Sequence, residues 1–189
     1  YSDEAAMLED LLEELTSEKT LVSYNGAAFD LPLLRDRMIL NRVARKIDCE
    51  QHLDLLHSAR RLFRRRLQDC TLTNVEEKIF EFFRTDDIPG YLIPSIYFEW
   101  LSEDNLDFMP GVMEHNRLDI VSLLGLVYRV ADIFGSEGDV LEEVDDLHSL
   151  SRVFGRRRDS AKVSRVYSRM DDLKEARLAD DIVLYHAMN

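Results

Sequence analysis

The sequence predicts an α/β domain followed by a helical C-terminal extension. A β-prone run at residues 20–24 is stopped by Asn25-Gly26 and lies between two stretches with the apolar spacing of amphipathic helices. Residues 139–189 are charged and helix-prone, and they carry no strand signal. With 189 residues, 46% of them hydrophobic, the chain can bury one core and a small appendage. We predict a domain at residues 1–135 and an extension at residues 139–189.

The N-terminal part is expected to alternate helices with short strands. Apolar residues at i, i+4 spacing predict a helix in which Met7, Leu8, Leu11, Leu12 and Leu15 form the core face. Asp30 precedes a second helix, whose Pro32 is tolerated in the first turn, and is a natural N-cap. In order, we expect a helix at 2–15, a strand at 20–24, a helix from 31, a strand within 47–53 and a helix at 55–67.

The second part of the chain is predicted to be helical. Helices are expected at 74–83 and 94–101, separated by the turn residues Asp86-Asp87-Ile88-Pro89-Gly90. The longest helical pattern runs from about 112 to 134, and Gly135 and Gly138 end it. Residues 139–189 predict two or three amphipathic helices. The alternative interpretation is the start of a TPR-like helical-repeat array.

Charge and composition limit the partners of the chain. Lys and Arg number 24 against 37 Asp and Glu, a net charge of -13, so nucleic acid would have to be bound through local patches or metal ions. No apolar run approaches the roughly 18 residues that span a bilayer, so no membrane partner is expected. Two cysteines indicate a reduced, cytoplasmic protein.

Three acidic or imidazole side chains are candidates for chemistry. His115 and Asp119 lie four residues apart, so they share one face at the end of an otherwise apolar helical stripe. A satisfied internal pair is the simpler interpretation of these two residues, as a helix cap is of Asp30. Together, Asp30 and Asp119 have the hard oxygen ligands that select Mg²⁺ or Mn²⁺.

Four motifs, in the same order, resemble a known family. They are Tyr24-Asn25-Gly26-x-x-Phe29-Asp30-x-Pro32-Leu33-Leu34, His52-Leu53-Asp54-Leu55-Leu56-His57-x-Ala59-Arg60-Arg61-Leu62, Asp86-Asp87-Ile88-Pro89-Gly90 with Ile93-Pro94 and Tyr97-Phe98, and His115-Asn116-Arg117-Leu118-Asp119 with Ser122-Leu123. In these motifs the chain resembles the YprB-type ribonuclease-H-like domain family, which is related to DnaQ-like 3′-5′ exonucleases of the DEDD superfamily. The resemblance covers about residues 1–134.

The resemblance implies an RNase H-like fold and hydrolysis of phosphodiester bonds with two Mg²⁺ or Mn²⁺ ions. Asp30 would be the acid of the second exonuclease motif and Asp119 that of the third, both of them metal ligands and catalytic. His115 would be the general base or the residue that positions water. Its spacing to Asp119 is that of the Tyr-x-x-x-Asp subclass, whereas histidine-type members usually have one residue more.

Contacts to DNA or RNA are expected from Asn25 and from the basic cluster that contains Arg60, Arg61 and Arg64. A solvated helix face paired with nearby acids is the alternative interpretation of this cluster. Asp54 is more often a helix cap than a metal ligand in related enzymes. We therefore place it below Asp30 and Asp119.

One departure from the family pattern affects activity. The Asp-x-Glu of the first motif should precede the opening helix, and three strands of the expected sheet would also come before it. Asp48-x-Glu50 has the right letters but follows the second motif, so we interpret it as a coincidence. We therefore expect this chain alone to be impaired as an exonuclease. The alternative is a non-catalytic module that binds nucleic acid, or a protein through its C-terminal helices.

Overall fold

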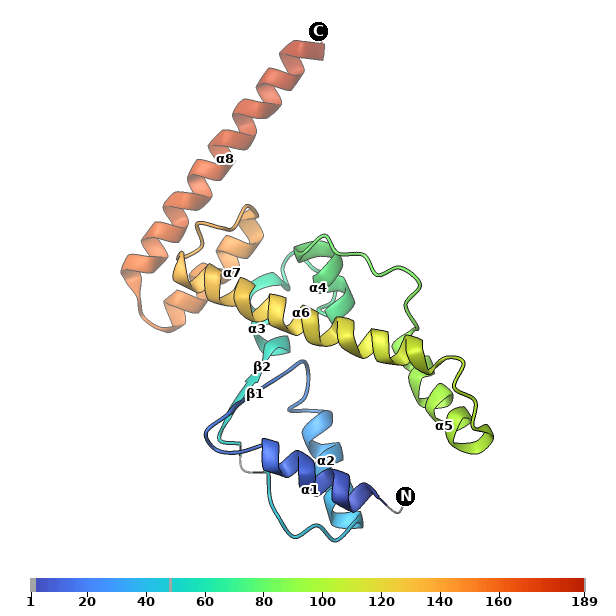
Figure 1. The fold of residues 1–189 in the computed structure, drawn as a ribbon. Helices are drawn as coiled ribbons and strands as arrows, with labels where there is room; N and C mark the ends of the chain where they lie inside the picture. Colours follow the sequence, from blue (N-terminus) through green and yellow to red (C-terminus); the bar gives the residue numbers. More distant parts are fainter. Residues whose placement is uncertain (1–2, 48, 189) are drawn as a thin grey trace. The chain divides into compact units, whose positions relative to one another are not determined.

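The computed structural model describes residues 3–47 and 49–188, with side chains to residue 179. The chain divides into two compact units, Tyr1–Arg60 and Arg61–Asn189, and each is described by itself (Figure 1). Ser2 and Asp48, which we placed in the first helix and in the Asp48-x-Glu50 pattern, lie outside the described residues.

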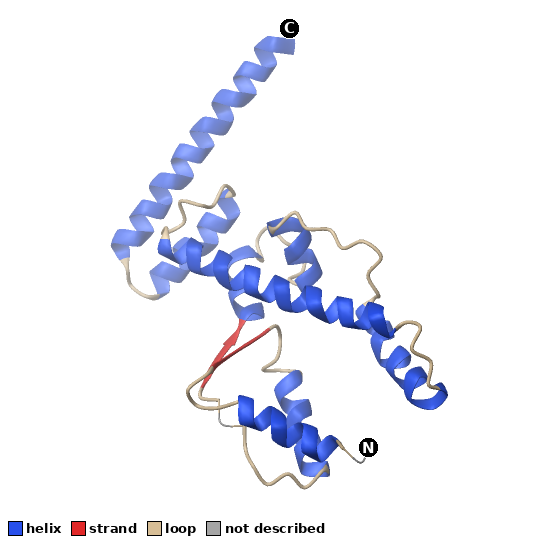
Figure 2. Cartoon of the chain, in the orientation of Figure 1, coloured by secondary structure: helices blue, strands red, loops and turns tan. Residues whose placement is uncertain are grey.

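The first unit is built on a two-stranded parallel sheet (Figure 2). Its strands are paired in register from Thr20 opposite Gln51 to Ser23 opposite Asp54. Parallel strands need a crossover, and here a helix supplies it. In order, the elements are α1 (Glu4–Glu14), β1 (Thr20–Ser23), α2 (Asp30–Leu40), β2 (Gln51–Asp54) and the start of α3 (Leu55–Phe63).

A small apolar cluster holds α1 to α2. Leu8 and Leu12, one turn apart on α1, are buried with Met38 of α2, and Leu34, Val43 and Ile47 pack against them. An ion pair between Glu4 and Arg37 also joins the two helices. The prediction that Met7 and Leu11 belong to this core is wrong. Met7 and Leu11 are 60% and 37% exposed because the buried face of α1 is narrow and contains only Leu8 and Leu12 among its described residues.

All regular elements of the second unit are helices in the residues that the structure describes. The long helix α6 packs against α4 and α5, and α7 packs against α8 (Figure 1). Its elements after the end of α3 are α4 (Leu72–Ile79), the 3-10 turn η1 (Gly90–Leu92), α5 (Ile93–Glu103), α6 (Met109–Gly135), α7 (Val144–Arg156) and α8 (Ser160–Met188).

Apolar contacts fix α6 to the C-terminal helices. Phe134 of α6 meets Phe154 of α7 edge to face, with ring centroids 6.0 Å apart. Gly138, at φ 97, allows the chain to turn after α6, and an added Cβ there would lie 3.1 Å from a methyl of Leu147. Buried side chains continue this core at Leu141, Leu147, Leu150, Phe154, Val166 and Met170.

The described part of the chain agrees with the predicted fold class: a parallel strand pair with helices, and then a helical extension. Residues 139–189 contain α7 and α8 among those described, within the expected two or three helices. The boundary between 135 and 139 and the TPR-like alternative stay predictions. No helix in the described chain is both long and apolar enough to cross a bilayer.

Candidate active site

Asp30 opens α2 with an uncommitted carboxylate. The predicted N-cap role is wrong, because α2 begins at Asp30 itself and no side chain caps it. The preceding turn already satisfies the helix start, since Leu31 N–H donates to Gly26 O at 2.9 Å and Leu33 N–H to Phe29 O at 3.2 Å. Asp30 is exposed, and its carboxylate has no hydrogen bond within the described chain.

Asp54 holds the loop between β1 and α2. Its Oδ1 accepts from Asn25 N–H at 2.9 Å and from Leu56 N–H at 3.1 Å, and its Oδ2 accepts from Ala27 N–H at 3.1 Å. Burial raises the pKa of Asp54, but these backbone donors outweigh burial and hold that pKa below its ordinary value. The bond to Leu56 N–H caps α3, so the interpretation of Asp54 as a cap is confirmed.

In the second unit, the loop of residues 84–90 runs along one face of α6 in the opposite direction. Ile88 lies against Gly111, where an added Cβ would be 3.0 Å from Ile88 Cγ1. Asp87 contacts His115, and Arg84 contacts Asp119. Gly111, His115 and Asp119 are four residues apart, so the loop follows a single stripe of the helix.

Arg84 is the buried centre of this arrangement. Its side chain is 4% exposed, and that of its partner Glu76 is 0% exposed. Nε donates to Glu76 Oε2 at 2.7 Å, while Nη2 donates to Glu76 Oε1 at 2.6 Å and to Asp119 Oδ1 at 2.6 Å. Nη1 donates to Asp87 Oδ2 at 3.1 Å. Burial alone would lower the pKa of Arg84, but the bonds to Glu76, Asp119 and Asp87 raise it above its ordinary value.

His115 lies between two carboxylates. Its Nδ1 is 2.9 Å from Asp87 Oδ1, and its Nε2 is 3.6 Å from Asp119 Oδ2. Burial raises the pKa of Asp87, but hydrogen bonds from Arg84 and His115 outweigh burial and lower it. The predicted common face of His115 and Asp119 is confirmed.

Sequence reasoning missed Glu76, Arg84 and Asp87 as parts of this site. Asp87 lies in the run Asp86-Asp87-Ile88-Pro89-Gly90, whose residue types indicate a turn and not a partner for His115. No sequence signal marks Arg84 as buried, because Phe82 and Phe83 directly before it are themselves exposed. Glu76 has no signal either, because a glutamate on a short helix is usually exposed.

The donor atoms available for a metal ion are hard oxygens but few. Asp119 Oδ2 and the Asp30 carboxylate have no hydrogen bond within the described residues, so these oxygens are available as ligands. In proteins, Mg²⁺ is often held by one or two carboxylates together with substrate phosphates. Asp30 belongs to the first unit, and His115 and Asp119 belong to the second. No group of three or more His, Cys, Asp or Glu in the described chain could hold a metal by itself.

The predicted nucleic-acid contacts lie on the surface. Arg60, Arg61 and Arg64 are exposed and have no ion pair among the described residues. Their neighbours Arg65 and Arg66 are instead paired with Asp145 and Asp146 of α7. Asn25 is exposed and adopts φ 65, a conformation that asparagine tolerates in tight turns.

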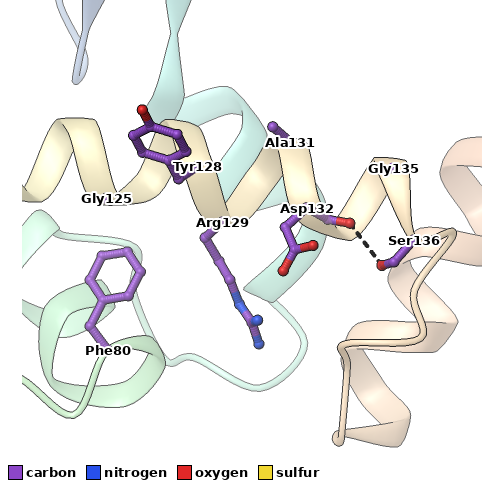
Figure 3. Close-up of a pocket in the computed structure, with 8 residues that line it drawn as sticks. All are labelled: Phe80, Gly125, Tyr128, Arg129, Ala131, Asp132, Gly135 and Ser136. Carbon is purple, nitrogen blue, oxygen red and sulfur yellow. Dashed lines mark hydrogen bonds between the residues drawn. The ribbon is translucent and has the colours of Figure 1, made fainter.

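An open hollow of about 750 Å³ lies between the end of α4 and the C-terminal half of α6 (Figure 3). None of the predicted site residues lines it. The lining residues are Phe80, Gly125, Tyr128, Arg129, Ala131, Asp132, Gly135 and Ser136.

Comparison with known proteins agrees with this arrangement of motifs. A family model described as the RNase H superfamily matches residues 1–131. The chain belongs to the RNase H superfamily. This RNase H-like chain is also 31% identical over 194 residues to the Bacillus subtilis (strain 168) protein with the name "Uncharacterized protein YprB". That alignment covers 99% of the chain but 46% of the relative, so the chain spans about half of the relative's length. No solved structure matches it.

The YprB-type resemblance and the RNase H-like fold class are therefore confirmed. Membership of this superfamily makes the domain a nuclease-type or nucleic-acid-related one.

Proposed function

We propose that this RNase H-like chain is the nuclease-type domain of a metal-dependent 3′-5′ exonuclease that hydrolyses phosphodiester bonds of DNA or RNA. The observation that carries the proposal is the facing pair on α6, with His115 Nε2 3.6 Å from Asp119 Oδ2. A base beside a carboxylate with a spare oxygen is what water activation next to a bound cation requires.

His115 is proposed to act through Nε2. Because Nδ1 is engaged by Asp87, Nε2 is the ring nitrogen left to accept a proton from an attacking water. The imidazole is 17% exposed, so it is held by its neighbours yet open to solvent on one side. This combination suits a general base or a residue that orients water.

Asp30 and Asp119 are the residues proposed to hold Mg²⁺ or Mn²⁺. When bound, such a cation supplies Lewis-acid stabilisation of the charge that develops on the phosphoryl group. Arg84 holds Asp119 Oδ1 at 2.6 Å, which fixes the carboxylate and leaves Oδ2 for other contacts. Arg60, Arg61 and Arg64, which have no ion pair among the residues that the structure describes, are cations suited to the phosphates of a bound strand.

The test is hydrolysis of a labelled single strand by the full-length protein with Mn²⁺ present. Asp119→Asn should abolish metal-dependent cleavage while the fold is kept, because an amide oxygen still accepts from Arg84. A 5′-labelled strand should be shortened stepwise from its 3′ end. Asp132→Asn, an exposed acid on the same helix, is the matched control. Unchanged cleavage by Asp119→Asn would contradict the assignment.

The alternative function is a non-catalytic module that binds nucleic acid or a protein. The ion pair between Arg84 and Asp119 favours it, because a buried guanidinium already neutralises the acid that would otherwise hold the metal. Binding across a salt series separates the two kinds of partner. Phosphate contacts predict an affinity that falls steeply with salt, whereas an apolar protein contact should change little.

A further inference from the structure

The contacts around His115 decide which ring nitrogen carries the proton in the neutral side chain. Nδ1 is 2.9 Å from Asp87 Oδ1 and 3.0 Å from Asp87 Oδ2, which are hydrogen-bond distances to an ionised carboxylate. A carboxylate can only accept, so Nδ1 must donate. Neutral imidazole has one N–H, and the other nitrogen, Nε2, therefore has the lone pair.

The competing tautomer has poorer geometry. It would need Arg84 Nη1 to donate to Nδ1 at 3.5 Å and Nε2 to donate to Asp119 Oδ2 at 3.6 Å. Both distances are longer than a good hydrogen bond. It would also place the Nδ1 lone pair against Asp87 at 2.9 Å, which is electrostatically unfavourable.

Asp87 is itself fixed in place. Its Oδ2 accepts from Arg84 Nη1 at 3.1 Å, and its side chain is only 18% exposed. Arg84 is in turn held by a bidentate pair with the fully buried Glu76. A chain of contacts thus runs from a rigid buried pair through Asp87 to the imidazole, and its members come from α4, the loop of residues 84–90 and α6.

The space at Nε2 is kept open. Nε2 and Asp119 Oδ2 are two acceptors 3.6 Å apart, an arrangement that a water molecule can bridge by donating one hydrogen to each. Gly90 lies on this side of the ring and has no side chain to fill the space, whereas an added Cβ would lie 3.8 Å from Nε2.

From these contacts we propose that Asp87 is a positioning residue, which holds His115 in the tautomer with its proton on Nδ1 so that Nε2 is presented as a base. This inference rests on the proposed function for its catalytic meaning, but the tautomer itself can be measured without substrate or metal. Asp87 is not a catalytic residue in this scheme, because its hydrogen bonds within the described chain go to the base and to Arg84.

The test is a long-range ¹H–¹⁵N correlation spectrum of the histidine rings in the intact chain, at about pH 8.5, where histidine is ordinarily neutral. The chain has five histidines, and His115→Gln identifies the signal of interest. We expect the Nδ1–H pattern in the unmodified protein. An Nε2–H pattern, or a doubly protonated ring, would overturn the proposal.

Three variants extend the measurement. Asp87→Ala should convert His115 towards the Nε2–H tautomer, while Asp87→Asn should keep the Nδ1–H form because its amide oxygen still accepts. Asp86→Asn, next to it and exposed, is the matched control and should leave the spectrum unchanged. A His115 spectrum that Asp87→Ala does not alter would also contradict the proposal. The spectrum of the unmodified protein is decisive even if Asp87→Ala fails to fold.

Nuclease rates separate this proposal from the proposed function. Asp87→Ala should lower kcat by about 10- to 100-fold with little change in KM, as removal of a residue that orients a histidine typically does. Asp87→Asn should recover part of the rate. If no form of the protein cleaves nucleic acid but the tautomer is as expected, the nuclease assignment fails and the positioning contact stands.

Discussion

Arg84 donates from Nη2 to Asp119 Oδ1 at 2.6 Å, so a buried cation holds the acid that we propose as a metal ligand. The two residues are 35 positions apart and come from a loop and from α6. This contact keeps one oxygen of Asp119 occupied and fixes the direction of the other. We therefore expect the stability of the second unit to depend on the buried cation, and the proposed chemistry to depend on it as well.

Arg84→Met should strongly destabilise the second unit. Removing the guanidinium leaves Glu76, which is 0% exposed, as a buried charge without its partner, and breaking such a pair costs about 3–5 kcal/mol. The measurement is the free energy of unfolding from urea titration. Arg61→Met, at an exposed arginine that has no ion pair within the described part of the chain, should stay within about 0.5 kcal/mol of the original protein. Equal losses of unfolding free energy in the two variants would mean that Arg84 and Glu76 do not form a buried ion pair.

Asp54→Asn should destabilise the first unit and change its acid sensitivity. The amide nitrogen cannot accept from Ala27 N–H, so the variant loses a hydrogen bond to a charged group, which is worth about 1.5–3 kcal/mol. The folded-state pKa of Asp54 is lowered, so its stabilisation is present above the unfolded value of about 3.9 and is lost as pH falls towards the folded value.

The unfolding free energy of the original protein should therefore drop below about pH 4, and the Asp54→Asn variant should show a shallower drop over the same range. Unfolding midpoints between about pH 2 and 7 check this expectation. Asp10→Asn, an exposed position on α1, controls for the loss of one negative charge. Parallel pH curves for Asp54→Asn and the original protein would show that the three backbone bonds do not depend on ionised Asp54.

Gly26→Ala should be poorly tolerated because of Ser23. The added Cβ would lie 2.6 Å from Ser23 Cβ and closer still to its hydroxyl, so the end of β1 would have to move. Overpacking of this kind costs about 1–3 kcal/mol. In a Ser23→Gly background both clashing atoms are gone, and Gly26→Ala should then lower the free energy of unfolding only slightly. A double-mutant cycle of unfolding free energies measures the coupling, and additive values would refute the close approach.

Gly90→Ala should reduce activity without unfolding the protein. The new methyl would sit 3.8 Å from His115 Nε2 in ordinary van der Waals contact, so it costs little stability but crowds the nitrogen proposed to accept a proton. We expect kcat to fall by about tenfold, a part of the roughly 10²- to 10⁴-fold that general-base catalysis supplies. Gly155→Ala, where nothing lies within 4 Å of the added Cβ, should leave the rate unchanged and serves as the control. A normal rate in Gly90→Ala would place the reacting water elsewhere.

The sequence alone determined the elements and the local pairs. Period and propensity are local properties, and so the strand at Thr20–Ser23, the long helix through His115 and Asp119, and the cap at Asp54 could all be predicted. The prediction that Asp30 caps a helix is wrong for a local reason. The backbone N–H groups of Leu31 and Leu33 donate to the carbonyls of Gly26 and Phe29, so they do not need a side-chain acceptor.

Only the tertiary structure decided what surrounds the candidate site. Glu76 lies on α4, and Arg84 and Asp87 lie in the loop of residues 84–90. Their roles follow from burial, since a buried guanidinium needs several carboxylates around it to compensate for its lost hydration. The periodicity of the sequence cannot predict which carboxylates pair with the buried guanidinium, because these residues meet only after the chain has folded.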